Sequence, residues 1–286
     1  LFDRLVLSTI ITYDAQQKAQ IKTGPRWWHC GRSDGSFHKE TKSSENGITV
    51  GKEENMPESI KIGRAPAVLY GEPAERAFLF VHGLCGNKEE AQRFAAVVDP
   101  LGWQVLAVDL PEHNGRQDGV RLVPWEAVPE LQNVRNYMKE RWRTLGVRAV
   151  SLGAWLALQA FAGERVEHCL LSSPLLDMEK MIHGMMAQTG VSEERLRAEG
   201  EIPVPGGQTL SWHYLCWARE HPVSSLSSKT ALLYGAKDEM IPRSTIDTYC
   251  RKFACSLTVA EGATHWFHTP AEVARMSQWE REQLEK

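Results

Sequence analysis

The 286-residue chain lacks the features that most directly mark nucleic-acid-binding and membrane proteins. Its 33 basic and 36 acidic residues are interspersed, giving a net charge of −3, and no run of like charge is long enough to indicate a polyanionic partner. Apolar runs are all too short to span a bilayer. We therefore expect neither a nucleic-acid partner nor a membrane span.

Metal and cofactor signals are also missing. The chain has no C-x-x-C pair, no H-E-x-x-H segment and no glycine-rich phosphate loop, and its ten histidines do not fall at ligand spacing. We expect no metal and no cofactor. The six cysteines are scattered, and this pattern favours reduced, buried thiols in a cytoplasmic protein. They are Cys30, Cys85, Cys169, Cys216, Cys250 and Cys255.

The first 58 residues differ in character from the rest. An apolar stretch near the start lacks a basic leader and a small-residue cleavage site, so we expect no secretion signal. Residues 15–58 are polar and show no hydrophobic period, which predicts an irregular extension over residues 1–58. Trp27 and Trp28 within it favour packing on the core or on a partner subunit, and a homo-oligomer remains open.

From residue 59 to 286, short apolar runs alternate with amphipathic stretches. The runs are nearly continuous in apolar residues, as in strands covered on both faces, so the alternation predicts an α/β fold with a mostly parallel sheet and helices on both faces. Residues 177–229 fit no strand-helix unit. We predict that they form a helical cap inserted into the domain.

Ser151 lies where an apolar strand meets an apolar helix, in the segment "AVSLG". Serine at such a joint is often only a helix cap. Here small residues, Ala149 and Gly153, stand two positions before and after it, as a sharp strand-to-helix turn exposing the serine side chain requires. Ser151 is therefore a candidate nucleophile.

A serine nucleophile needs a base, and the base needs an orienting carboxylate. Asp238 follows the strand "TALLYG", and His265 follows the last strand in "EGATHWFH". With Ser151 they resemble the ordered serine, acid and histidine of the α/β-hydrolase superfamily, although Ala149 replaces the first glycine of its G-x-S-x-G motif. Glu239 and His268 are the rivals for the acid and the base. The resemblance favours Asp238 and His265.

The resemblance extends to "FLFVHGLCG", where a strand ends in His82 and Gly83. In the superfamily this position provides half of the oxyanion hole, which implies that the backbone N–H groups of Leu84 and Leu152 hold the oxyanion. The segment "VDLPEHNGR" resembles a D-x-P-x-H-G element of the superfamily. Asn114 interrupts that element, so no catalytic role is expected for His113 or Arg116.

Together these residues predict acyl transfer to water and a small-molecule ester as substrate. The size and position of the cap resemble those of cinnamoyl esterases and monoacylglycerol lipases, which implies small to medium apolar or aromatic esters. Candidate substrate contacts in the cap are Met181, Met185, Trp212 and Trp217. A thioesterase, an acyltransferase, a serine peptidase or a non-catalytic ligand-binding protein on the same fold are the alternatives.

Overall fold

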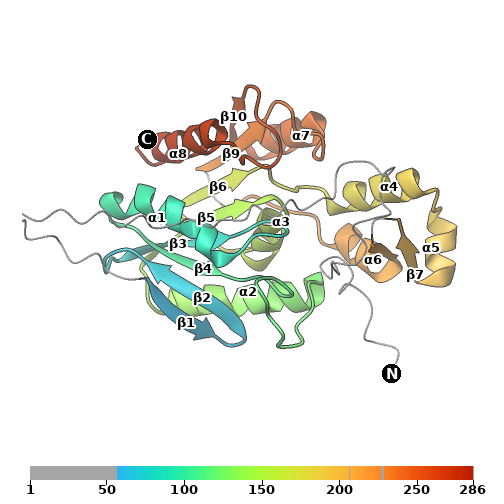
Figure 1. Cartoon of the computed structure of the whole chain (residues 1–286), viewed down its shortest axis with the longest axis horizontal. Helices are drawn as coiled ribbons and strands as arrows, with labels where there is room; N and C mark the ends of the chain where they lie inside the picture. Colours follow the sequence, from blue (N-terminus) through green and yellow to red (C-terminus); the bar gives the residue numbers. More distant parts are fainter. Residues whose placement is uncertain (1–56, 206, 227–228, 286) are drawn as a thin grey trace, which may run out of the picture.

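A computed structural model describes residues 57–205, 207–226 and 229–285 (Figure 1). The extension expected over residues 1–58, with Trp27, Trp28 and Cys30, therefore lies almost entirely outside the described residues. The described chain folds around an eight-stranded sheet in the order β1-β2-β4-β3-β5-β6-β9-β10. The strand β2 runs antiparallel to β1 and β4, and the other neighbours are parallel. The predicted α/β fold with a mostly parallel sheet is confirmed.

The strands follow the apolar runs closely, because the central ones are buried on both faces. One apolar run, residues 59–71, forms two strands rather than one, because the chain turns back at Gly63, whose φ of +59° suits glycine. The strands are β1 (Glu58–Ile62), β2 (Ala65–Tyr70), β3 (Arg76–Val81), β4 (Gln104–Val108), β5 (Thr144–Val150), β6 (His168–Ser172), β9 (Thr230–Gly235) and β10 (Ser256–Ala260).

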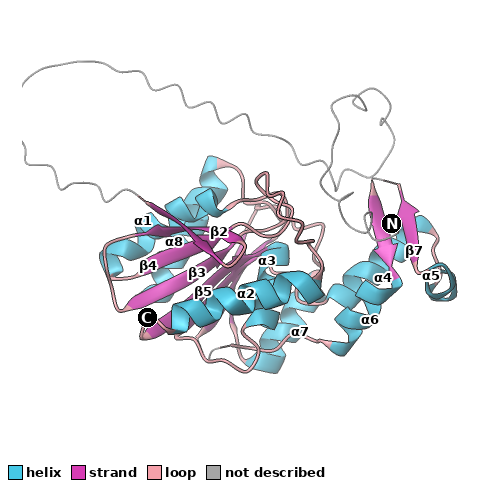
Figure 2. Cartoon of the chain, turned by 90° about the horizontal axis from the view of Figure 1, so that it is seen from below, coloured by secondary structure: helices cyan, strands magenta, loops and turns pink. Residues whose placement is uncertain are grey.

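Helices cover both faces of the sheet, as Figures 1 and 2 show. On one face α1 and α8 pack over a core that includes Phe78, Phe94 and Trp279. On the other face α2, α3 and α7 pack over a larger core that continues into the segment between β6 and β9. The helices are α1 (Ala91–Val98), α2 (Pro124–Lys139), α3 (Ser151–Ala160), α7 (Arg243–Phe253) and α8 (Pro270–Leu284), with short 3₁₀ turns at Lys88–Glu90 and Asp99–Leu101.

The segment between β6 and β9, called here the insertion (residues 177–229), lies beyond one end of the sheet (Figure 1). It is not purely helical as expected, because two of its strands form an antiparallel pair. In "EIPV" every second residue is buried, a period of two that suits a strand rather than a helix. Its elements are α4 (Met178–Thr189), α5 (Glu193–Glu199), β7 (Glu201–Val204), β8 (Gln208–Ser211) and α6 (Trp212–Glu220).

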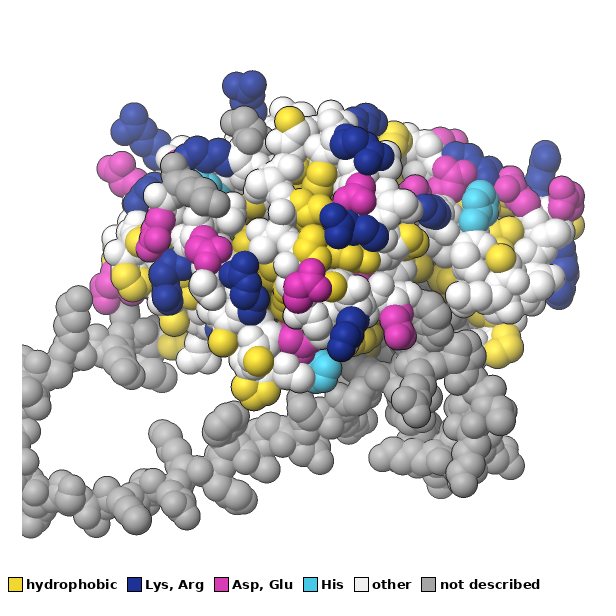
Figure 3. Space-filling view, turned by 90° about the horizontal axis from the view of Figure 1, so that it is seen from above, with side chains coloured by type: hydrophobic (Ala, Val, Ile, Leu, Met, Phe, Trp, Pro, Cys, Tyr) yellow, Lys and Arg dark blue, Asp and Glu magenta, His cyan; other side chains and the backbone are white. Residues whose placement is uncertain are grey.

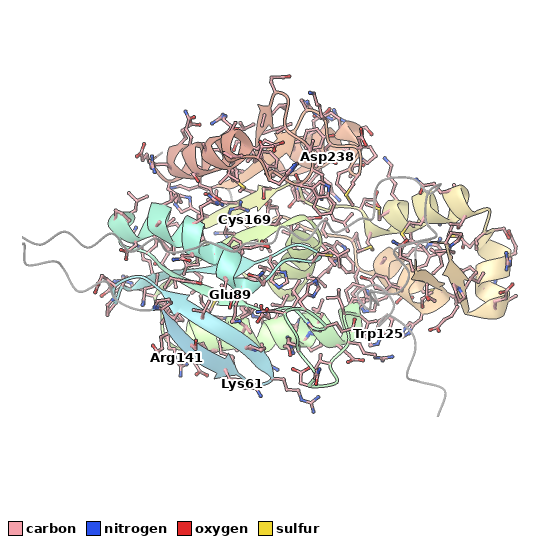
Figure 4. All side chains as sticks on the ribbon, viewed as in Figure 1. Lys61, Glu89, Trp125, Arg141, Cys169 and Asp238 are labelled. Carbon is pink, nitrogen blue, oxygen red and sulfur yellow. The ribbon has the colours of Figure 1, made fainter. Side chains whose placement is uncertain are left out.

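Aromatic stacking joins the insertion to the main domain. Trp125 in α2 stacks on His213 in α6 with ring centroids 4.0 Å apart, and Figure 4 labels Trp125 where α2 meets the insertion. Trp217 in α6 packs edge-on against the buried Trp155 in α3 at 5.4 Å. These contacts set where the insertion stands relative to the end of the sheet.

The structure bears on the expectations for the surface charges and for the cysteines. Basic and acidic side chains mix over the face in Figure 3. No disulfide joins the five described cysteines, but only Cys169 is fully buried and Cys85 is exposed, so the expectation that all are buried is wrong. Among residues 57–285, with the gaps given above, no helix is long and apolar enough to cross a membrane. Cytoplasmic location stays a prediction.

Candidate active site

Ser151 is the first residue of α3, directly after β5, and its backbone is strained. Its φ of +47° lies in the left-handed region, which costs a non-glycine residue about 1–3 kcal/mol. A Cβ at Gly153 would stand 2.1 Å from the carbonyl oxygen of His82, so only glycine fits there. Ala149, by contrast, is a fully buried residue within β5 that accommodates its methyl group. The two small residues flanking Ser151 are therefore not equivalent.

Three side chains from separate strand ends form a chain of hydrogen bonds. His265 Nε2 lies 2.9 Å from Ser151 Oγ, and His265 Nδ1 lies 2.8 Å from Asp238 Oδ2. Donation from Nδ1–H to the carboxylate leaves Nε2 free to accept the serine proton. The structure thus brings together the three residues that the sequence singled out. Figure 4 labels Asp238 on the side of the sheet nearest the insertion.

The carboxylate of Asp238 is held by its own loop after β9. Its side chain is fully buried, and Oδ1 accepts hydrogen bonds from the backbone N–H groups of Met240 and Ile241, both at 2.9 Å. Such bonds offset the cost of burying a charged group. Tyr234 donates its hydroxyl to Ile241 O at 2.8 Å and closes the loop. The rival acid, Glu239, is exposed.

The loop that carries His265 is held by a residue that sequence reasoning missed. Glu272, in the first turn of α8, accepts from the backbone N–H of Thr264 at 2.8 Å and of Thr269 at 2.9 Å. Burial opposes its ionisation, but these hydrogen bonds outweigh it and lower the pKa of Glu272 to about 2. The capping-box pattern T-x-x-E was a signal for it. The rival base, His268, is exposed beside Glu272.

Two backbone N–H groups near Ser151 are available as donors. Leu84 N donates no hydrogen bond to any described residue. Leu152 is the second residue of α3, and the first N–H groups of a helix have no intrahelical acceptor. Gly83 lies close to Ser151, since a Cβ there would be 3.4 Å from Ser151 Cβ. The resemblance implied these two N–H groups, and their role in holding an oxyanion stays a prediction.

A cavity of about 130 Å³ opens beside Ser151 between the end of the sheet and the insertion. Its walls are dominated by apolar side chains. They are Leu84, Leu122, Leu152, Leu175, Met178, Met181, Ile182, Met185, Leu210, Tyr214, Met240, Ile241 and Trp266, together with the polar Ser151, Gln208, Thr209 and Ser211. Such a lining suits an apolar ligand group. No group of three His, Cys, Asp or Glu side chains within the described ranges is arranged to hold a metal ion.

The four candidate substrate contacts divide into two pairs. Met181 and Met185 in α4 line the cavity. Trp212 and Trp217 are not among its lining residues, because both pack on the protein itself. Trp217 stacks on His221 with ring centroids 3.9 Å apart. The aromatic residue that the insertion contributes to the cavity wall is instead Tyr214, in the first turn of α6.

Comparison with known proteins extends the fold assignment. No family model matches the chain, and no curated protein matches its sequence. Est1E from Butyrivibrio proteoclasticus, solved with ferulic acid bound, is 18% identical, with a TM-score of 0.58 over 80% of this chain and 100% of that one. Alpha/beta hydrolase domain-containing protein 10 from mouse is 14% identical, with a TM-score of 0.63 over 80% and 98%.

An esterase from Pyrococcus furiosus is 14% identical, with a TM-score of 0.59 over 87% of this chain and 98% of that one. All three structures share the arrangement of sheet and covering helices described above. At these identities the likeness concerns the fold and not the activity. The chain has the α/β-hydrolase fold.

Proposed function

We propose that the protein is a serine hydrolase that cleaves carboxylic esters through an acyl-serine intermediate. The observation that carries this proposal is the hydrogen-bonded series Asp238, His265 and Ser151, whose serine lines an apolar cavity. A serine hydroxyl is a weak nucleophile near neutral pH and needs such a base. The proposal also explains the strained φ of Ser151, because the turn presents the hydroxyl to the cavity.

In the first half-reaction, Ser151 Oγ attacks the ester carbonyl carbon while His265 Nε2 accepts its proton. Asp238 accepts from Nδ1–H and stabilises the resulting imidazolium. The tetrahedral intermediate places a negative charge on the former carbonyl oxygen, and the N–H groups of Leu84 and Leu152 are the proposed donors to it. Collapse releases the alcohol, which takes the proton from Nε2, and leaves the acyl group on Ser151.

In the second half-reaction, His265 removes a proton from water, and the hydroxide attacks the acyl carbonyl. The same two N–H groups hold the second oxyanion. Collapse releases the carboxylic acid and returns the proton to Ser151 Oγ. Side chains, backbone N–H groups and water carry every step, so the proposal includes no cofactor and no metal.

The lining of the cavity supports substrates with a small to medium apolar or aromatic acyl group. Burying each additional methylene in such a cavity is worth about 0.8 kcal/mol. The insertion would act as a cap over the acyl group, with Met181 and Met185 in contact with it. Est1E, a similar fold, was solved with an aromatic carboxylic acid bound, which agrees with this class of acyl group.

The test is hydrolysis of a series of p-nitrophenyl esters, from acetate to longer chains, by wild type and Ser151→Ala. Ser277→Ala is a matched control, because Ser277 lies in α8 and bonds Arg93 away from the cavity. We expect the Ser151 variant to lose about a thousandfold or more in kcat, as removal of a nucleophile does, and the control to stay within about twofold. A wild type without hydrolysis, or a Ser151 variant as active as wild type, would overturn the proposal.

A further inference from the structure

Two imidazoles bracket the loop that carries Leu84. His82 follows β3 and His113 lies in the loop after β4, and both rings are buried with centroids 4.8 Å apart. Each ring binds the backbone of residues 82–86 by one nitrogen, although the two histidines are far apart in the chain. The serine, histidine and aspartate chemistry leaves both imidazoles unused.

His82 holds the peptide plane before Leu84. Its Nδ1 donates to Gly83 O at 2.7 Å, and Gly86 N donates to the same oxygen at 3.1 Å. Since the peptide unit is planar and trans, its C=O and N–H point in opposite directions. Fixing Gly83 O on one side therefore fixes Leu84 N–H on the other side. His82 Nε2 accepts from Leu110 N at 3.0 Å, so the ring itself is held at both nitrogens.

His113 holds the peptide plane after Leu84. Its Nε2 accepts from Cys85 N at 3.1 Å, and its Nδ1 donates to Pro111 O at 2.8 Å. Cys85 adopts a left-handed φ of +65°, an uncommon conformation for a residue with a side chain. The bond from Cys85 N to His113 stabilises that conformation. The two imidazoles thus fix both peptide planes that meet at Leu84.

The loop that carries His113 is itself firmly held. Asp109 accepts from Lys88 N at 2.9 Å and from Lys88 Nζ at 2.7 Å. Arg116, almost fully buried, binds both carboxylate oxygens of Glu130 at 2.7 and 2.8 Å and the carbonyl of Asp109 at 2.6 Å. His113 is therefore a fixed support and not a mobile surface residue.

We propose that His113 is a positioning residue: by accepting a hydrogen bond from Cys85 N–H, its imidazole fixes the loop at Leu84 and aims Leu84 N–H at the oxyanion. The inference rests on the proposed function, because it concerns the same oxyanion. His113 touches no reacting atom in this account and acts only through the backbone. The sequence led us to expect no catalytic role for His113. A positioning role is compatible with that expectation, because it depends on the hydrogen bond to Cys85 N–H, which forms only in the folded protein.

The positioning role requires an uncharged ring, since a protonated Nε2 cannot accept a hydrogen bond. Burial lowers the pKa of His113 below its usual range, against the hydrogen bond to Pro111 O that raises it. Burial also lowers the pKa of His82 to about 3. The charged groups facing His113 are Asp109 and Arg116, of opposite sign. The neutral form that burial favours is also the form that the hydrogen bonds require, because each Nε2 accepts from a backbone N–H.

The experiment compares wild type, His113→Leu and His113→Gln by steady-state kinetics on one p-nitrophenyl ester. Leucine removes the acceptor, whereas the glutamine side chain carries an amide oxygen that can replace Nε2. Loss of an entire oxyanion donor costs about 10²- to 10³-fold in kcat, so a misaimed donor is expected to cost about 10- to 100-fold. KM is expected to stay within about twofold, and glutamine to restore kcat to within about fivefold.

A boronic acid that forms a tetrahedral adduct with the serine gives the second readout. Its inhibition constant is expected to rise in His113→Leu by the same factor by which kcat falls, because both report the oxyanion. His168→Leu is the matched control: His168 is a buried histidine on β6, and its replacement is expected to lower stability but not kcat. In wild type, the Leu84 amide is expected to gain protection from hydrogen exchange when the boronate binds.

Three results would overturn the positioning role while leaving ester hydrolysis by a Ser151 nucleophile intact. They are an unchanged kcat in folded His113→Leu, a glutamine variant as impaired as the leucine variant, and a Leu84 amide that gains no protection in the wild-type boronate complex. The last measurement needs no variant to fold. Failure of the proposed function looks different, because wild type would then hydrolyse no ester and bind no boronate at Ser151.

Discussion

The two walls of the cavity are built in different ways. On the sheet side, backbone contacts and buried hydrogen bonds fix Ser151, Asp238 and His265, and Ser151, the proposed nucleophile, keeps a strained φ. On the insertion side, α4 contributes three methionines and Ile182 to the wall, and β8 and α6 contribute residues 208–211 and Tyr214. The ion pairs of the insertion lie outside, where Arg219 binds Glu179 and Glu193 at the surface.

The two walls suit different roles, one in holding the reacting groups and the other in accommodating the substrate. A wall made of backbone atoms and hydrogen-bonded polar groups keeps reacting groups in place, and at Gly153 it has no room for an extra methyl group. A wall of unbranched, flexible methionines adapts to ligands of different shape. We therefore expect the same kind of substitution to have large effects in the first wall and small effects in the second.

The largest contrast is expected for glycine to alanine. In Gly153→Ala the new Cβ meets His82 O at 2.1 Å and Val81 O at 2.8 Å, and neither backbone atom can move away. We expect a loss of about 3 kcal/mol or more in the free energy of unfolding, with activity below detection. Gly184→Ala, on the exposed side of α4, meets nothing within 4 Å and is expected to gain about 0.5–1 kcal/mol. Urea unfolding measures both, and equal effects would contradict the contrast.

A smaller contrast is expected for glutamate to glutamine. Glu272→Gln removes the charge that binds both sides of the His265 loop, and we expect a loss of about 2 kcal/mol in stability and a severalfold fall in kcat. Glu193→Gln breaks an exposed pair with Arg219 and is expected to leave kcat and the denaturation midpoint unchanged. A Glu272 variant that behaves like the Glu193 variant would show that the loop does not depend on this carboxylate.

The effect of Glu272 on stability is expected to depend on pH. Its pKa is about 2 in the folded protein and is ordinarily 4.5, so the ionised form stabilises the fold. That contribution is complete above pH 4.5 and is lost as the pH falls from 4.5 towards 2. The difference in unfolding free energy between wild type and Glu272→Gln should therefore shrink over this range. A difference that stays constant would contradict the assignment.

The smallest effect is expected in the insertion wall. Met181→Ala enlarges the cavity without touching the reacting groups, so we expect the preferred acyl chain to lengthen by about two methylenes. Changes in kcat/KM should stay within about tenfold for each ester. Met276→Ala is the matched control, because Met276 in α8 packs beside Arg148 and does not line the cavity. An unchanged chain-length profile in Met181→Ala would remove Met181 from the acyl pocket.

The sequence predicts those features of the molecule that depend on residues close together in the chain. Apolar runs located the buried strands, and the residues after their ends included Ser151, Asp238 and His265, which the fold then brings together. The position of each strand end follows from the pattern of its own residues. The identity of the three residues came from the resemblance in order and spacing.

The remaining features depend on contacts between segments distant in the chain. Nothing local to Trp212 or Trp217 shows that Tyr214, rather than either tryptophan, lines the cavity. Likewise, His113 bonds Cys85, 28 positions away, and this contact exists only once β3 and β4 pair. The hairpin of β7 and β8 was missed for a different reason, because a helical expectation for the whole insertion concealed its alternating pattern.

The central claim is that Ser151 is the nucleophile, and labelling with a fluorophosphonate followed by peptide mass spectrometry tests it most directly. The reagent forms a covalent adduct with an activated serine hydroxyl. We expect one adduct per chain, located on the peptide containing Ser151, lost in Ser151→Ala and in His265→Ala, and retained in Ser277→Ala. An adduct on another residue, or no adduct in an otherwise folded wild type, would contradict the account.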